Sequence, residues 1–468
     1  MVAVAAGGLI LVAVAGCGSS ARSVPMQSVG TVRSAQGTLP QGTLPEGTLP
    51  QGTLPEGTLP QVTGDGVRAL WQGAPWQDPA ISDGMVLGVV QTENAAQVSA
   101  ASAMTGEPKW TLTLPKSLPQ VLGLLPAGNI VLVEAGRAFG RAPAMVYAGV
   151  TEYIAADATT GHQAWAAPGG GQSQNPPIAV AGDILLTGDP SGAVTARLVS
   201  TGQVVWHDPR PCTTAPSGGA ANAGLGIAAD GSLAVASFDC GPVVTVQRLD
   251  AATGKPLWSW TSPAVASGAG MYLSVTAAAR NGSVVMLTGQ VAPVPAATEF
   301  LASLPRRYPW PALLAPADQV SLVLALDAAD GHPRWSELGG QQETIELGDG
   351  AVCETVNTGM ECRDDTTGAT TMPDLVTGQE PYSSPPYVSG GIAAIVKPSR
   401  AGAVTVRMVS TQGGATVAQA RLALGLKGSH GQPVAVAAGP LPGGATLVLL
   451  RRVDGSGFAL LALRFPAR

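Results

Sequence analysis

The sequence has few charged side chains and few aromatic ones. Asp, Glu, Lys and Arg make up 12% of the 468 residues, about half their usual share, and aromatic residues make up only 4%. The 31 acidic and 25 basic residues give a formal net charge of −6, which excludes nucleic-acid binding by general electrostatic attraction and adhesion to an anionic membrane surface. Glycine (61) and proline (39) are abundant beside 45% apolar residues. Many turn formers with few charges indicate numerous short strands rather than long amphipathic helices.

The motifs of several enzyme classes are missing as well. The sequence holds no G-x-S-x-G, no H-E-x-x-H, no phosphate-binding Walker loop and no C-x-x-C. Four histidines have no second ligand at a fixed spacing, and we interpret them as surface residues: His162, His207, His332 and His430. We therefore expect no enzyme activity, no metal and no cofactor.

No apolar run at the N-terminus is long enough to cross a membrane. The run from Val2 to Ala15 has 14 residues, whereas a bilayer of about 30 Å needs roughly 20. Its length suits the apolar region of a signal peptide. The Ala-Gly-Cys ending at Cys17 resembles the lipobox of bacterial lipoproteins, which implies removal of residues 1–16 and a lipid on Cys17. The alternative is an ordinary secretory signal with a chance cysteine.

A low-complexity segment follows the apolar run. Residues 36–61 repeat QGTLP or EGTLP five times and end on Gln61, so that a proline recurs every fifth residue. No apolar face forms at that spacing, and such a segment cannot fold alone. We expect residues 17–65 to be a disordered linker that holds a folded domain, residues 66–468, away from the membrane.

Four further cysteines are expected to form two disulfides. Cys353 and Cys362 flank a segment in which Asn357, Thr358 and Gly359 favour a hairpin turn, and a hairpin brings its two strands within disulfide reach. Cys212 and Cys240 remain as the second pair. A metal site is the alternative, but an even number of cysteines outside the cytosol, without a Cys/His cluster, favours disulfides.

An internal repeat runs through the rest of the chain. In five places a Trp follows a glycine by four residues, and only about one such pair is expected by chance from 61 Gly and 9 Trp. The repeated strings are SAMTGEPKW, DATTGHQAW, STGQVVW, DAATGKPLW and DAADGHPRW. Two degenerate copies follow, with turn glycines at Gly368 and Gly413 and with Met372 and Val417 in the Trp position.

Each copy of the repeat predicts a strand, a tight turn and a second strand. Asp or Ser initiates the turn, and glycine supplies a positive φ. Another strand pair precedes each copy, so that one unit holds about four short strands and must stack on its neighbours to bury its faces. The units recur every 51 residues or so, as β-propeller blades with inserted loops do.

The count of blades depends on how the ring closes. Two apolar strands, 445–453 and 457–465, lack a following Trp strand, while residues 66–72 carry Trp71 without a preceding turn. Pairing residues 66–72 with the last three strands closes an eighth blade and removes an open sheet edge. We therefore predict an all-β fold, an eight-bladed β-propeller, with seven blades as the alternative.

The sequence segments 248–258 and 325–335 resemble the PQQ-like β-propeller repeat. That family includes quinoprotein dehydrogenases and BamB-like lipoproteins, and the resemblance covers residues 66–468. It implies that six tryptophans dock one blade against the next: Trp71, Trp110, Trp165, Trp206, Trp258 and Trp335. The quinone does not carry over, because the chain has no adjacent cysteine pair and no matching set of calcium ligands with a catalytic Asp. The repeated Asp is better explained by its turn than as a metal ligand.

One inserted segment is a candidate for partner binding. The 77 residues between Gly254 and Gly331 exceed a blade, and the excess corresponds to residues 291–319. This segment concentrates aromatic and arginine side chains of the type enriched at binding hot spots: Phe300, Arg306, Arg307, Tyr308 and Trp310. The alternative is a loop that packs its own aromatics onto the propeller.

These inferences favour a binding or assembly scaffold. We expect a monomeric propeller, lipid-anchored outside the cytoplasm of a bacterium, that presents its loops to a protein or polymer of the cell envelope. A quinone- or small-molecule-dependent oxidoreductase that uses the central funnel is the alternative from another class. A sensor ectodomain is a third, and it would need a partner chain.

Overall fold

The structure is a computed structural model, and it describes most of the chain from residue 59 onward. The described residues are 59, 61–64 and 66–467, apart from 74–75, 93–94, 140–145, 170–177, 189–191, 209–224, 240–242, 265–269, 279–283, 293–297, 306–319, 340–341, 349, 357–358, 373–386, 390, 399–402, 424–433 and 454–457. They belong to one structural unit that spans residues 52–468. The predicted signal peptide, and Cys17 with it, lies outside the described residues.

The described strands form eight antiparallel sheets. Blade 1 contains β3 (Gln77–Ser82), β4 (Met85–Thr92), β5 (Ala95–Ser102) and β6 (Pro108–Thr113). Blade 2 contains β7 (Gln120–Ala127), β8 (Ile130–Phe139), β9 (Val146–Asp157) and β10 (Gln163–Pro168). Blade 3 contains β11 (Ile178–Ala181), β12 (Ile184–Gly188), β13 (Val194–Leu198) and β14 (Val204–Asp208). Blade 4 contains β15 (Gly226–Asp230), β16 (Leu233–Asp239), β17 (Val244–Leu249) and β18 (Pro256–Thr261).

The second half of the unit repeats this plan. Blade 5 contains β19 (Gly270–Ala278), β20 (Val284–Ala292), β21 (Val320–Asp327) and β22 (Pro333–Gly339). Blade 6 contains β23 (Gln342–Gly348), β24 (Ala351–Val356), β25 (Gly359–Asp364) and β26 (Thr370–Met372). Blade 7 contains β27 (Tyr387–Ser389), β28 (Ile392–Pro398), β29 (Ala403–Ser410) and β30 (Thr416–Ala423). Blade 8 contains β31 (Val434–Pro440), β32 (Thr446–Val453), β33 (Phe458–Phe465) and β2 (Arg68–Gly73).

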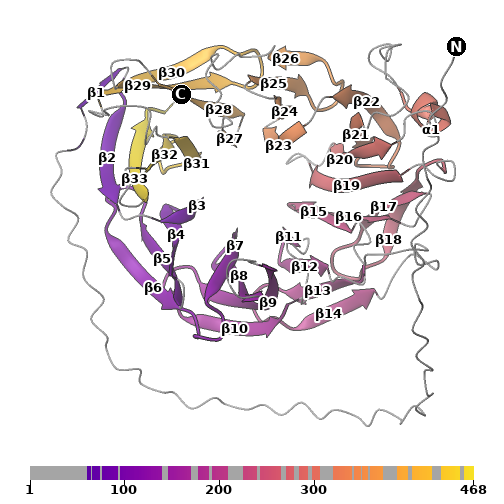
Figure 1. Cartoon of the computed structure of the whole chain (residues 1–468), viewed down its shortest axis with the longest axis horizontal. Helices are drawn as coiled ribbons and strands as arrows, with labels where there is room; N and C mark the ends of the chain where they lie inside the picture. Colours follow the sequence, from indigo (N-terminus) through magenta and orange to yellow (C-terminus); the bar gives the residue numbers. More distant parts are fainter. Residues whose placement is uncertain are drawn as a thin grey trace, which may run out of the picture. The chain divides into compact units, whose positions relative to one another are not determined.

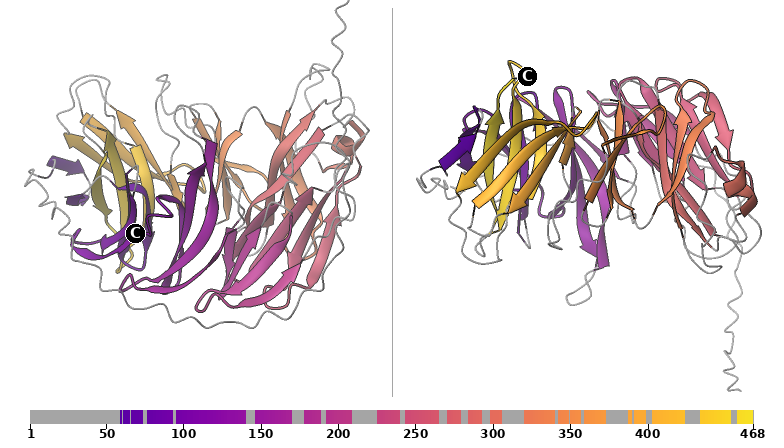
Figure 2. Two further views of the ribbon diagram at one scale, coloured as in Figure 1. Left: turned by 60° about the horizontal axis from the view of Figure 1, so that its bottom comes forward. Right: turned by 90° about the horizontal axis from the view of Figure 1, so that it is seen from above.

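The sheets stand around a central axis as the blades of a propeller (Figure 1). The first strand of each blade lies nearest the centre and the fourth lies at the rim, and Figure 2 shows the same ring from the side. Inner strands of most neighbouring blades contact one another, and β31 of blade 8 contacts β3 of blade 1. The prediction of eight blades is thereby confirmed, and the seven-blade alternative is wrong.

The ring closes through pairing between the two ends of the unit. Strand β2 pairs with β33, with Ala69 opposite Leu463 and Trp71 opposite Ala462. The fourth strand of blade 8 therefore comes from the start of the propeller. The sequence predicts this, because the segment with Trp71 has no preceding turn of its own. This pairing removes the edge that β33 would otherwise expose.

A further strand, β1 (Gln61–Gly64), lies on the outer edge of blade 7. It pairs antiparallel with β30, so that this sheet has five strands in the order β1-β30-β29-β28-β27. The sequence indicates no strand here, because residues 61–64 fall within the segment expected to be linker.

The hydrophobic core lies between the blades rather than within one of them. Alternate residues of β8 show why: Ile130 and Leu132 pack toward blade 3, whereas Val131 and Val133 pack toward blade 1. Side chains of successive strand residues point to opposite faces. A blade buried on both faces therefore needs near-continuous apolar strands, which explains the high apolar content of the chain.

One short helix, α1 (Thr298–Ser303), interrupts the strands between β20 and β21. Among the described residues, no helix has the length and hydropathy needed to cross a membrane.

Candidate functional site

Each of the six tryptophans at the rim contacts the next blade. Trp110, on the outer strand of blade 1, donates its indole Nε1–H to the carbonyl oxygen of Ala158 in blade 2, at 2.7 Å. The same contact recurs around the ring at 2.7–3.0 Å. The further pairs are Trp71 with Ala103, Trp165 with Val199, Trp206 with Ala251, Trp258 with Ala328 and Trp335 with Asp365. We call this arrangement an indole joint.

The turn glycine completes each indole joint. Gly161 has φ of +70°, and a Cβ placed on it would lie 2.6 Å from the ring of Trp110. Its N–H also donates to the Asp157 carbonyl at 2.8 Å, which closes the turn. The glycine is therefore needed twice, for its backbone conformation and for the close approach of the indole. Each repeat therefore contributes a glycine to the joint with the preceding blade and a Trp to the joint with the following blade, which explains why both recur in the repeats.

The Asp of the repeat holds the same turn. The Asp157 carboxylate accepts hydrogen bonds from the backbone N–H groups of Thr159 and Thr160, at 3.0 and 2.8 Å. Hydrogen bonds from the hydroxyls and backbone of these two threonines lower the pKa of Asp157 to about 2. Asp250 and Asp364 accept equivalent bonds from residues three positions later. The carboxylates of Asp157, Asp250 and Asp364 thus hold their own turns.

The joint between blades 6 and 7 is built without tryptophan. Met372 takes the position of the indole and approaches Gly414, whose added Cβ would lie 3.1 Å from the Met372 side chain. The missing indole donor is replaced by Thr371, whose hydroxyl donates to the carbonyl of Thr411 at 2.7 Å.

The repeat in blade 7 is shifted by one residue from its predicted position. The turn glycine is Gly414, with φ of +67° and an N–H bond to the Ser410 carbonyl at 2.9 Å, and not Gly413. Ala418 pairs with Met408 as Trp258 pairs with Arg248, so Ala418 rather than Val417 takes the Trp position. The prediction of Gly413 and Val417 was wrong because either of two adjacent glycines satisfies the motif when no Trp marks the register.

The joint between blades 7 and 8 has no indole either. The cluster between these blades contains Ala418 and Leu422 from blade 7 and Leu463 and Phe465 from blade 8. Val67, which lies between β1 and β2, is buried in the same cluster at 6% exposure. We call this joint, together with β1 and β2, the seam.

The structure describes one of the two predicted cysteine pairs. Cys353 and Cys362 face each other on β24 and β25 and form a disulfide, with their Cα atoms 4.0 Å apart. Both side chains are buried between blades 6 and 7. Cys212 and Cys240 lie outside the described residues.

The inserted segment is anchored by its helix. Leu301 and Leu304, in and just after α1, are buried at 3% and 4% exposure in the cluster between blades 4 and 5. The Pro305 carbonyl accepts hydrogen bonds from the backbone N–H and the hydroxyl of Ser336 on β22, both at 2.9 Å. Phe300 belongs to α1, whereas four candidate residues lie outside the described part: Arg306, Arg307, Tyr308 and Trp310.

A buried polar cluster between blades 2 and 3 is absent from the sequence-based predictions. Glu134 on β8 lies opposite Tyr153 on β9, and Arg197 on β13 lies opposite Leu185, which packs against the Tyr153 face. One carboxylate oxygen of Glu134, the Tyr153 hydroxyl and Arg197 Nε are buried without a hydrogen-bond partner. Gly123 makes room for the carboxyl group, because a Cβ there would lie 2.3 Å from Glu134 Oε2.

The chemistry of this cluster follows from its burial. Burial raises the pKa of Glu134 to about 7. Burial and then the charge of Glu134 raise the pKa of Tyr153, and burial lowers the pKa of Arg197. The one sequence signal was a Glu inside the apolar run of β8.

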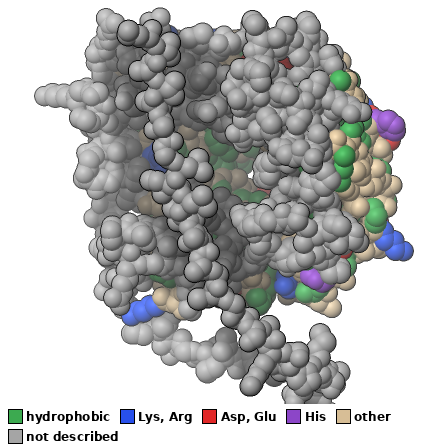
Figure 3. Space-filling view, turned by 45° about the vertical axis from the view of Figure 1, so that its right-hand side comes forward, with side chains coloured by type: hydrophobic (Ala, Val, Ile, Leu, Met, Phe, Trp, Pro, Cys, Tyr) green, Lys and Arg blue, Asp and Glu red, His purple; other side chains and the backbone are tan. Residues whose placement is uncertain are grey.

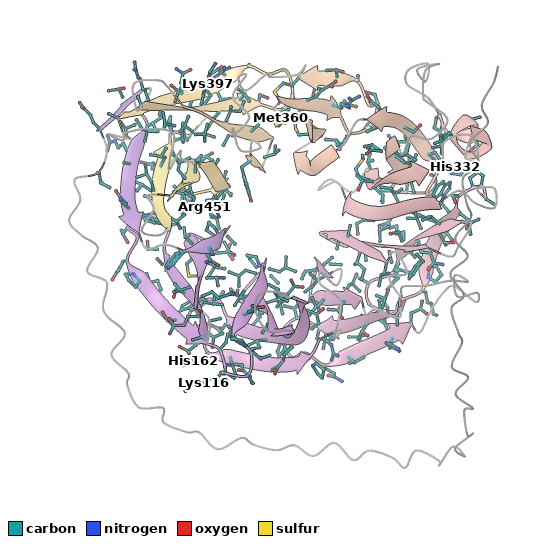
Figure 4. All side chains as sticks on the ribbon, in the orientation of Figure 1. Lys116, His162, His332, Met360, Lys397 and Arg451 are labelled. Atoms are coloured by element: carbon teal, nitrogen blue, oxygen red, sulfur yellow. A yellow bond between two sulfur atoms is a disulfide. The ribbon has the colours of Figure 1, made fainter. Side chains whose placement is uncertain are left out.

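The titratable groups at the rim are dispersed. Figure 4 places His162 and His332 at the outer rim on different blades. In the described part of the chain, no three His, Cys, Asp or Glu side chains come together as a metal site would require. On the face shown in Figure 3, the described Lys and Arg side chains occur singly rather than as one patch.

Comparison with known proteins gives one family match. A family model described as outer membrane protein assembly factor BamB matches residues 61–221. Among curated proteins, none matches the chain.

Several solved structures are similar at low sequence identity. BamB from Moraxella catarrhalis is 14% identical, with 86% of this chain and 100% of that chain covered and a TM-score of 0.47. A europium-containing methanol dehydrogenase is 12% identical, with 85% and 93% covered and a TM-score of 0.45. The C-terminal WD40 domain of Sif2 is 11% identical, with 86% and 99% covered and a TM-score of 0.49.

The identity of the fold rests on the repeats themselves and on the family match to their first part. Five Gly-x-x-x-Trp copies, indole joints between successive blades and eight blades closed by β2 agree with that match. The described part of the chain is an eight-bladed β-propeller, and its first part, residues 61–221, matches the family model of the BamB-type PQQ-like repeat.

Proposed function

We propose that this chain is a binding or assembly scaffold for proteins or polymers of the bacterial cell envelope. The observation that carries the proposal is the closed ring: eight blades joined at their rims form a rigid frame, and binding residues are commonly placed on loops that such a frame positions. The matched family model adds support, because it describes an outer membrane protein assembly factor. The proposed activity is binding and not catalysis.

The proposal includes a lipid anchor and a tether. The Ala-Gly-Cys sequence at Cys17 supports acylation, and the repeats of residues 36–60 support a spacer between anchor and ring. Several acyl chains on one cysteine would hold the protein at a membrane, which a single chain does only marginally. The mechanism is geometric: the ring orients the binding loops, and the tether sets the distance at which they meet a partner.

Within this function, the aromatic and arginine residues of the inserted segment are the proposed partner contact. The segment's start is fixed by Leu301 and Leu304, which are buried between blades 4 and 5. Arg306, Arg307, Tyr308 and Trp310 follow it directly.

Crosslinking in intact cells tests the function. We expect wild-type protein to crosslink a defined envelope partner and intact-mass analysis of the membrane fraction to show an acylated Cys17. Replacing Tyr308 and Trp310 together by Ala should reduce that crosslink while the melting temperature stays unchanged. Cys17→Ser is the control for the anchor, because it should release the protein from the membrane without altering the ring. An unmodified Cys17, or no envelope partner in repeated experiments, would refute the proposal.

A further inference from the structure

The outer edge of blade 7 differs from the other outer edges in the described part of the ring. Its outer strand, β30, has eight residues, against three to seven in the outer strands of the other blades. The second half of β30 pairs with β1: Val62 lies opposite Leu422, and Gly64 lies opposite Ala420. Blade 7 thus already receives an additional strand at its edge.

Strand β1 is held mainly through its backbone. Three of its four residues are exposed, and only the Val62 side chain is half-buried against the cluster between blades 7 and 8. The Thr63 hydroxyl donates a long hydrogen bond of 3.4 Å to the Arg421 carbonyl at the surface. A short strand with so little buried side-chain area belongs to the least stable part of a structure. It can therefore leave the edge without unfolding the blades.

The edge of β30 sets specific requirements on the strand that occupies it. A strand that takes the backbone conformation of β1 needs glycine opposite Ala420, because at the φ of +152° found at Gly64 a Cβ would lie 2.3 Å from the Gln419 carbonyl oxygen. Opposite Leu422 an apolar side chain reaches the cluster, as Val62 does. The position between them faces solvent and accepts any side chain. The edge thus selects an apolar residue followed by glycine two residues later.

We propose that the outer edge of blade 7 is a binding site for an extended protein segment, which adds to β30 as an antiparallel strand in place of β1. The partner is a polypeptide with an apolar residue opposite Leu422 and glycine opposite Ala420. Strand addition of this kind gains affinity from backbone hydrogen bonds and specificity from alternate side chains. This inference rests on the proposed scaffold function, since it states how the scaffold takes a protein partner.

Strand β1 then acts as an internal competitor. Only residues 65–67 connect it to β2, and Val67 stays buried in the seam, so β1 remains beside the edge when it detaches. A segment tethered so closely competes at an effective concentration on the order of millimolar. A partner present at lower concentration gains access only when its own pairing is better than that of β1.

The test uses the purified full chain and a fluorescent peptide with the sequence LPQVTGDGV, which corresponds to residues 59–67. In the full chain, Gly64→Ala should expel β1 through the clash with Gln419 and leave the edge free. We expect this variant to bind the peptide at least about tenfold more tightly than the wild type does. A photoreactive group at the first valine of the peptide, which corresponds to Val62, should label residues 420–423.

Two controls separate this site from general effects. Gly84→Ala places the same substitution at a φ of +77° in blade 1, where nothing lies within 4 Å, and it should bind the peptide as weakly as the wild type. A peptide with alanine in place of its first glycine should bind neither protein. Val62→Lys weakens β1 without a backbone clash and replaces Gly64→Ala if that variant does not fold.

The outcome distinguishes this inference from the scaffold function. If folded Gly64→Ala and Val62→Lys proteins bind the peptide no better than the wild type does, or if labelling falls outside residues 420–423, strand addition at blade 7 is wrong. That result would leave the scaffold proposal in place, because crosslinking in cells tests it independently of this edge.

Discussion

The indole joints and the seam connect blades in different ways. At an indole joint, a Trp of one blade, a carbonyl and a glycine of the next form a complete unit, as Trp335 does with Asp365 and Gly368. Every residue of that unit belongs to the two repeats it connects. At the seam, Ala418 replaces the Trp, and Val67 from the other end of the propeller fills the interface.

The comparison shows how a closed ring avoids dependence on one type of contact. Residues 61–73 connect three blades, because β1 pairs with blade 7, β2 completes blade 8 and Trp71 joins blade 8 to blade 1. A repeat can encode its contact with the next repeat, but the last repeat has no successor in the sequence. The seam therefore depends on pairing between strands from the two ends of the propeller. Closing so long a loop costs more entropy than forming a joint between consecutive repeats, and we expect the seam to form more slowly.

The largest effect is expected from removing the closing segment. Deletion of residues 1–73 takes β1, Val67, β2 and Trp71 from the ring and exposes the edge of β33. We expect this protein to lose cooperative thermal unfolding, measured by circular dichroism, and to aggregate in gel filtration, because an unpaired apolar edge invites edge-to-edge association.

A shorter deletion serves as the control for closure. Removing residues 1–65 leaves Val67 and β2 in place and takes only β1 from the propeller. We expect this protein to stay monomeric and to melt a few degrees lower. If the longer deletion melts like the full chain, closure by β2 contributes nothing and the contrast between joints and seam is wrong.

A smaller effect compares an indole joint with the joint between blades 6 and 7, where Met372 takes the place of the indole. Gly161 faces the rigid Trp110 ring, whereas Gly414 faces the flexible Met372 side chain, and their φ angles are +70° and +67°. Alanine introduces the same backbone strain at both, of about 1–2 kcal/mol. At Gly161 the new Cβ also displaces the indole, so we expect Gly161→Ala to lower the free energy of unfolding by about 3 kcal/mol and Gly414→Ala by about half of that.

Urea denaturation midpoints of the two variants measure this difference. Gly443→Ala is a suitable reference, because Gly443 has φ of +80° and nothing lies within 4 Å of its Cβ position. Equal losses at Gly161 and Gly414 would show that the indole adds no rigidity to its joint.

The sequence predicts the ring well because its joints are local. A Trp placed four residues after a turn glycine marks a blade, and Trp71 without a turn marks the strand that closes the ring. In blade 7 no Trp follows the turn, so the sequence does not show which of two adjacent glycines closes it. The prediction of Gly413 instead of Gly414 was wrong for this reason.

Two features of the candidate sites are absent from the sequence-based predictions. Strand β1 is four residues long and directly follows a proline repeat, so that neither alternation nor length indicated a strand. Glu134 and Tyr153 lie opposite each other within blade 2, and Arg197 of blade 3 joins them only when the two blades stack. Contacts made by stacking of blades are not encoded in the pattern of any single strand.

The smallest effect is expected at the joint between blades 2 and 3, which contains a buried carboxyl group in addition to its indole. The interface between blades 2 and 3 contains Trp165 and also Glu134, whose pKa is raised from 4.5 to about 7. A carboxyl with a higher pKa in the folded state stabilises the fold only while it is protonated there. Its contribution is therefore greatest below pH 4.5, and stability falls as the pH rises from about 4.5 to about 7.

Glu134→Gln removes this titration while keeping the shape of the side chain. We expect the variant to match the wild type near pH 4.5 and to exceed its free energy of unfolding by about 2 kcal/mol at pH 8, since each unit of pKa shift corresponds to about 1.4 kcal/mol and Glu134 is not fully buried. Melting temperatures of both proteins between pH 4.5 and 8 measure the difference, and Glu107→Gln at the exposed rim is the control. A variant that is less stable than the wild type at pH 8 would mean that the Glu134 charge is compensated inside the joint. The indole joint between blades 2 and 3 would then include an ionic contact, and its stability would not follow from tryptophan and glycine alone.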